Sequence, residues 1–178
     1  MKFFISNIAA VFITFSLVAN SQAGEDMEAR IAHARTAAPP SISANATVMV
    51  NGEVAAKGSN GWTCMPDTLP ADNAPMCNDA MWMKMLTAVG NKADFVADGF
   101  GISYMLMGDI GSGVSNSDPY HADHKNAADY VETGPHLMII VPKEMLQGIT
   151  DDPSVGGPWI MWGDTPYAHI MVPLADVK

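Results

Sequence analysis

The sequence has few charged residues, and few of these are basic. Only 16% of the 178 residues are Asp, Glu, Lys or Arg, and 9 basic residues stand against 19 acidic ones, a formal net charge of −10. Such a chain repels phosphate backbones and anionic lipid headgroups, so we expect neither nucleic acid nor a membrane surface as a partner. The 48% of hydrophobic residues is typical of a globular protein.

The sequence motifs of the common enzyme classes are also absent. The chain has no Gly-x-Ser-x-Gly nucleophile elbow, no His-Glu-x-x-His zinc motif, no Gly-x-x-x-x-Gly-Lys phosphate loop and no dinucleotide-binding fingerprint. We therefore predict a non-catalytic binding or interaction domain rather than an enzyme. A hydrolase with an unfamiliar site remains one alternative.

The first residues are typical of a secretory signal peptide. Lys2 precedes an apolar run over residues 8–18, and the small residues Ser21 and Ala23 suit cleavage after Ala23. The run falls short of the roughly 20 residues that span a bilayer. We predict a signal peptide over residues 1–23, a single periplasmic or secreted domain over residues 24–178, and no membrane span after cleavage.

Only two cysteines are present, Cys64 and Cys77. In an exported chain such a pair is typical of a disulfide, and the spacing is unlike the Cys-x-x-Cys pattern of redox-active pairs. Pro66, Pro70 and Pro75 disfavour regular structure between them. We therefore predict a disulfide that fastens a loop to the start of the following helix.

Patterns of hydrophobicity predict an α+β fold. Residues 24–37 are rich in helix formers, and a second helix from about residue 80 has one apolar face made of Trp82, Met85, Leu86 and Val89. Strands are expected over residues 46–50, 53–56 and 100–107, followed by a long irregular segment, residues 108–134. We predict a mainly antiparallel sheet with two or three helices packed on one face.

Three segments in the last third of the chain repeat one pattern, a ring-bearing residue, an aliphatic residue and a methionine. They are His136–Met138, Trp159–Met161 and His169–Met171. Residues i and i+2 of a strand point to the same side, so each ring shares a face with its methionine. The repetition predicts three neighbouring strands of one sheet.

Two of these segments suggest a metal site as an alternative function. Thioether and imidazole groups are ligands that Cu(I) prefers, so His136, Met138, His169 and Met171 are candidate copper ligands. In the plainer interpretation the methionines, 14 in the chain, fill the core and the histidines donate to backbone carbonyls where their strands begin.

The long irregular segment contains further polar candidates. Tyr120 and Asp118 are possible pocket residues, and a hydrolase would use His136 or His169 with Asp118 or Asp109 as the orienting acid. A pair of histidines at residues 121 and 124 has a spacing that zinc ligands use, although such a pair is common by chance.

Several longer strings resemble a family of small secreted bacterial proteins of unknown function. They are NGWTCMPD at residues 60–67, PMC at 75–77, SNSDPY at 115–120, GPHLM at 134–138 and TPYAHIMVP at 165–173. The resemblance implies export and a single domain. It brings no activity, ligand or catalytic residue to this chain.

Overall fold

The computed structural model describes residue 24 and residues 26–175, so the predicted signal peptide over residues 1–23 lies outside the described residues. Residues 26–35 are helical, as predicted. A short helix α2 (Pro40–Ser43) follows and begins on Pro40, whose missing N–H costs nothing at a first helical position. No helix among the described residues is long and apolar enough to cross a membrane.

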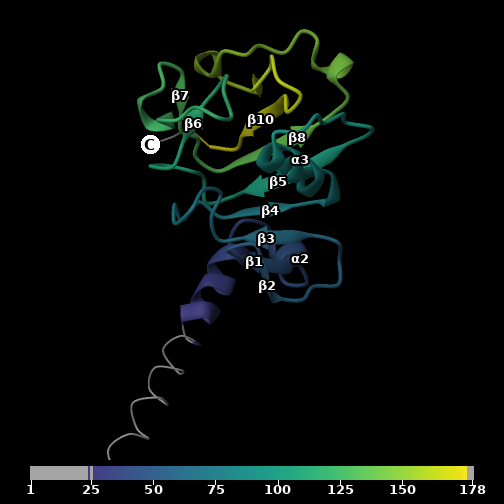
Figure 1. The fold of residues 1–178 in the computed structure, drawn as a ribbon, viewed down its shortest axis with the longest axis vertical. Coiled ribbons are helices and arrows are strands. Elements are labelled where there is room, and N and C mark those ends of the chain that lie inside the picture. The colour runs from purple at the N-terminus through teal and green to yellow at the C-terminus, as the bar shows by residue number, and fades with distance from the viewer. Residues whose placement is uncertain (1–23, 25, 176–178) are drawn as a thin grey trace, which may run out of the picture.

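The fold is built on one eight-stranded sheet in the order β2-β1-β3-β4-β5-β8-β10-β9. Figure 1 shows most of these strands lying one above another, with α3 beside β5 and β8. Every neighbouring pair is antiparallel except β1 and β3. The predicted α+β class with a mainly antiparallel sheet is confirmed.

A hairpin forms one edge of the sheet. β1 (Thr47–Val50) pairs with β2 (Glu53–Ala56) across a two-residue turn. Asn51 and Gly52 in that turn have φ of 53° and 82°, and two positive φ values are what a tight hairpin turn of this kind requires. The strands predicted over residues 46–50 and 53–56 are confirmed.

The two cysteines form the predicted disulfide, with an S–S distance of 2.05 Å. Both lie in strands, however: β3 (Thr63–Met65) pairs with β4 (Met76–Asn78), and Cys64 lies directly opposite Cys77. The predicted loop is therefore confined to the segment between the strands. Its prolines fall outside the strands, where no ladder hydrogen bond is lost.

Helix α3 (Ala80–Asn91) is fixed at its start by Asp79. One carboxylate oxygen of Asp79 accepts from the backbone N–H of Trp82 at 2.9 Å, and the other accepts from the N–H of Ile102 at 2.7 Å. Ile102 lies in β5 (Gly101–Met105). A single side chain thus caps the helix and ties it to the sheet. The helix ends at Asn91 and is followed by Lys92 in the left-handed conformation.

Separate hydrophobic clusters lie on the two faces of the sheet. Met76 and Cys77 are consecutive in β4 and so point to opposite faces. Met76 belongs to the cluster that includes Trp82 and Met85 of α3. Cys77 belongs to the cluster that the N-terminal helical region covers with Ala34, Ala37 and Ala38. The helices are therefore divided between the two faces.

The three strands with the repeated pattern are neighbours, as predicted. β8 (His136–Ile140), β10 (His169–Pro173) and β9 (Trp159–Met161) lie side by side in that order. Two short 3₁₀ helices, η2 (Lys143–Leu146) and η3 (Pro153–Val155), occur in the connection from β8 to β9. In all three strands the ring and its methionine are buried.

The segment over residues 108–134 is more regular than expected. It contains β6 (Val114–Ser115), the 3₁₀ helix η1 (His124–Asn126) and β7 (Tyr130–Val131), and the two strands form a small second sheet. The carboxylate of Asp129 accepts from the hydroxyl of Ser115 at 2.8 Å and from the N–H of Ser117 at 2.8 Å. Side-chain hydrogen bonds of this kind hold the chain at residues 115–117 in one conformation.

Candidate functional site

The four candidate copper ligands lie on one face of the sheet. In the register of β8 and β10, Met138 is directly opposite Met171. His136 precedes Met138 by two residues and His169 precedes Met171 by two, so both imidazoles point to the side of the methionines. Because the strands are antiparallel, the two histidines lie at opposite ends of the methionine pair.

The hydrogen bonds of both histidines fix their tautomers. Nδ1 of His136 lies 2.7 Å from the carbonyl oxygen of Gly134, and Nδ1 of His169 lies 2.9 Å from that of Tyr167. A carbonyl oxygen only accepts, so Nδ1 carries the proton in each ring. In the neutral ring Nε2 is then an acceptor with a free lone pair.

Neither Nε2 lone pair has a partner in the described part of the chain. His136 is 0% exposed and His169 is 1% exposed, so bulk water does not solvate them. An unsatisfied buried acceptor costs about 1–3 kcal/mol. Two such atoms on neighbouring strands therefore need an explanation, and a bound ligand is one.

Burial also keeps both rings neutral. It lowers the pKa of His169 to about 4, against the opposing effect of the hydrogen bond to Tyr167, with a further lowering from His136. Burial lowers the pKa of His136 in the same way, opposed by its bond to Gly134. At neutral pH both Nε2 atoms are consequently available to accept a hydrogen bond or to bind a metal ion.

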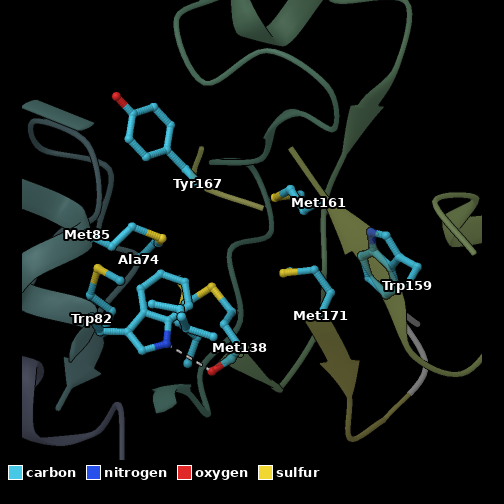
Figure 2. Close-up of a cluster of buried hydrophobic side chains, with 11 residues drawn as sticks. Ala74, Trp82, Met85, Met138, Trp159, Met161, Tyr167 and Met171 are labelled. Carbon is cyan, nitrogen blue, oxygen red and sulfur yellow. Dashed lines mark hydrogen bonds between the residues drawn. The ribbon is translucent and has the colours of Figure 1, made fainter. Parts of the chain in front are cut away.

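The four side chains line one cavity of about 160 Å³. Its remaining walls come from α3, from strands β4 and β5, from β9 with the residue after it, from the loop at residues 68–69 and from the segment that follows β5. Figure 2 shows Met161 and Met171 with their sulfur atoms directed toward the region of Trp82 and Met138. The pattern-based prediction thus named side chains that the fold gathers around one space.

Two tryptophans hold His169 in place. The rings of Trp82 and Trp162 both meet the imidazole edge to face, each with its centroid 5.1 Å away. The indole N–H of Trp82 donates to the carbonyl oxygen of Met138 at 3.2 Å, which is the dashed line in Figure 2. The sequence pattern places Trp82 on the apolar face of its helix and predicts no role for Trp162, because a contact across three elements leaves no local pattern.

One carboxylate belongs to the cavity wall, that of Asp109. Burial raises its pKa to about 6, while the N–H group of Thr133, which donates to it, acts in the opposite direction. Nearby Ser112 donates to the carbonyl oxygen of Asp72 at 2.9 Å, which joins the two loops beside the cavity. Of the two acids considered for a hydrolase, Asp109 therefore shares the cavity with both histidines.

The other polar candidates lie elsewhere. Tyr120 and Asp118 are not among the described residues that line the cavity. The hydroxyl of Tyr120 lies 3.0 Å from the carbonyl oxygen of Val89 and 2.9 Å from the hydroxyl of Tyr167. Asp118 is exposed and accepts from the N–H of Tyr120 at 2.8 Å. Tyr120 therefore ties this segment to the end of α3, and the bond of Asp118 lies within the segment.

A site of zinc type is not assembled in the described residues. No three His, Cys, Asp or Glu side chains there are grouped so that they could hold a metal ion, and this includes the histidines at residues 121 and 124. The cavity between the histidines and methionines thus remains the candidate site of the described chain.

Comparison of the chain with protein-family models, with curated proteins and with solved structures found no match.

Proposed function

We propose that this protein is an exported, non-catalytic binding protein that holds a small ligand in the cavity between α3 and strands β8 and β10. The observation that carries the proposal is the pair of buried, unpartnered Nε2 atoms of His136 and His169 at that cavity. The disulfide between Cys64 and Cys77 supports export, because such bonds persist in oxidising compartments.

Several features favour binding over catalysis. No described hydroxyl or carboxylate lies within hydrogen-bond distance of either Nε2, so a nucleophile and its base are not preassembled. The cavity is small and is walled mainly by apolar side chains. A cavity of this size accommodates a metal ion or a ligand of about the size of benzene.

The proposal can be tested with two chemically different probes, Cu(I) and phenol. Phenol offers one O–H donor to an imidazole acceptor and an apolar ring to the cavity. We expect at least one probe to bind with a stoichiometry of one, to shift the ring resonances of both histidines, and to be recovered unchanged.

The matched variants place the same substitution inside and outside the cavity. Val114→Phe adds volume at the cavity wall, whereas Val96→Phe changes a side chain that is 83% exposed. Binding should be lost in the first variant and kept in the second. If neither Cu(I) nor phenol binds, the proposal is refuted. Ester hydrolysis that disappears in His169→Leu would favour the hydrolase alternative instead.

A further inference from the structure

We propose that the ligand of this cavity is a neutral aromatic alcohol of the phenol class, whose hydroxyl group donates a hydrogen bond to Nε2 of His169 and whose ring packs against the methionines and indoles of the wall. This inference rests on the proposed binding function and names the class of its ligand. It depends on the size of the cavity, on one unpaired acceptor, on the groups that line the wall and on their charges.

The size of the cavity suits a single six-membered ring. Its volume is about 160 Å³. An apolar cavity of about 150 Å³, lined by aliphatic and aromatic side chains, holds one benzene molecule. A ring with one small substituent therefore fills this space, whereas a larger ring system would force the wall to rearrange.

A buried acceptor in the wall requires a donor from the ligand. Nδ1 of His169 carries the ring proton, because it lies 2.9 Å from the carbonyl oxygen of Tyr167, so Nε2 has a free lone pair. The side chain is 1% exposed, and its Nε2 has no partner among the described residues. A ligand with an O–H group removes the penalty of this unpaired acceptor. A ligand without a donor, such as benzene, leaves the penalty in place.

His169, rather than His136, lies in the aromatic part of the wall. Trp82 and Trp162 each meet its imidazole edge to face, with centroids 5.1 Å apart, and both indoles also line the cavity. His136 lies opposite Met105 of β5, four residue steps from His169, which is about 13 Å along the strands. One small ring cannot span that length, so a ring beside the indoles reaches the acceptor of His169.

Methionine side chains supply much of the remaining wall. Those that line the cavity are Met76, Met105, Met138, Met161 and Met171. Figure 2 shows the sulfur atoms of Met161 and Met171 directed toward the region of Trp82 and Met138. Thioether sulfur makes favourable contacts with aromatic rings, and the unbranched side chain adapts to the shape of its neighbours. The wall therefore favours an aromatic ring over an aliphatic ring of similar size.

The charges of the wall favour a neutral ligand. No lysine or arginine is among the described residues that line the cavity, and burial lowers the pKa of His169 to about 4, so an anion would meet no counter-charge. The carboxyl group in the wall is that of Asp109, and burial raises its pKa to about 6, so its charged form is itself disfavoured there. An unpaired ion in such a cavity is strongly disfavoured. Phenol, like the tyrosine side chain, ionises only near about pH 10 and would enter as a neutral molecule.

The test is calorimetric titration of the protein at pH 7 with phenol, benzene and cyclohexanol. Phenol should bind with a stoichiometry of one and more tightly than cyclohexanol, because only phenol makes sulfur–aromatic contacts. In His169→Leu the ratio of phenol affinity to benzene affinity should fall by at least about tenfold, the usual size of the effect when a buried acceptor loses its donor. The ratio corrects for any change that the substitution makes to the volume of the cavity.

His121→Leu is the matched control, since this histidine is exposed and lies outside the cavity lining. It should keep the phenol-to-benzene ratio of the wild type. A second measurement needs no variant and so holds even if His169→Leu fails to fold. In the wild type, the nitrogen resonance of Nε2 in His169 should shift on addition of phenol and much less on addition of benzene.

Several results would overturn the inference. One is an unchanged phenol-to-benzene ratio in folded His169→Leu, and another is a ratio that falls in His136→Leu alone. Equal shifts of the His169 resonance with phenol and benzene, or tighter binding of benzylammonium or cyclohexanol than of phenol, would also overturn it. A protein that binds Cu(I) but not phenol would overturn the inference and leave the binding function intact, whereas one that binds neither would refute that function as well.

Discussion

Met138 and Met171 face each other across β8 and β10, and each is flanked, two residues earlier in its own strand, by a buried histidine. This arrangement gathers two thioethers and two neutral imidazoles at one cavity. The same residues also pack the core, so their ligand role and their structural role must be separated by substitutions that preserve volume.

The disulfide should contribute substantially to stability. Cys64 and Cys77 are separated by 13 residues and join two adjacent strands. We expect Cys64→Ala/Cys77→Ala to lower the free energy of unfolding by about 3 kcal/mol, because the crosslink restricts the unfolded chain. Urea denaturation of the two proteins measures this difference. In a reductant the wild type should approach the variant only after unfolding, since both cysteines are 0% exposed.

Asp79 should contribute more to the free energy of unfolding than a residue that only caps a helix. It accepts from Trp82 at the start of α3 and also from Ile102 in β5. We expect Asp79→Ala to lower the free energy of unfolding by about 2 kcal/mol, the sum of a lost cap and a lost sheet hydrogen bond. Asp94→Ala, at an exposed position after the helix, is the control and should stay within about 0.5 kcal/mol. Equal effects of the two substitutions would contradict this role.

Stability should depend on pH through His169. Its pKa is about 4 in the folded protein and 6.5 ordinarily. Between these values the unfolded state binds more protons, so this stabilisation is present above pH 6.5 and is lost as the pH falls toward 4. His169→Leu should remove up to about 3 kcal/mol of this dependence in urea denaturation between pH 4 and pH 7. His121→Leu, at an exposed position, should keep the pH dependence of the wild type.

Titration of Asp109 should change stability with pH in the direction opposite to that of His169. Its pKa is raised from 3.8 to about 6, so the folded state binds more protons between these values and loses stability as the pH rises through them. Relative to the wild type, Asp109→Asn should therefore become more stable by about 2 kcal/mol as the pH rises from 4 to 7. A difference that does not change with pH would show that the folded carboxyl group titrates normally. Asp94→Asn is the matched control.

Much of the β8, β9 and β10 region was predictable from the sequence. The repeated ring and methionine pattern predicts buried faces and neighbouring strands, and both are confirmed, because period-two burial is a local property of a strand. The disulfide was predictable for a similar reason, since only one pairing of two cysteines exists. The convergence of His136 and His169 on one cavity required the register of β8 and β10, which no local pattern contains.

Other features depended on contacts between distant residues. The strands around the cysteines were not expected, because Pro66 and Pro75 suggested a loop, yet both prolines fall just outside β3 and β4. The order within residues 108–134 depends on Asp129 and its hydrogen bonds to the turn. The placement of Asp109 in the cavity wall follows from the same segment folding back over the sheet.

The most direct test of ligand binding at this cavity is the long-range proton–nitrogen NMR spectrum of the histidine rings, recorded before and after addition of Cu(I) and, in a second sample, of phenol. Before addition, His136 and His169 should have protonated Nδ1 and unprotonated Nε2 at pH 7. After addition of a probe that binds, the Nε2 resonances of both rings should shift together and saturate at a stoichiometry of one. Resonances of these two rings that neither Cu(I) nor, in a second sample, phenol changes, or shifts confined to the other three histidines of the chain, would contradict the proposed site.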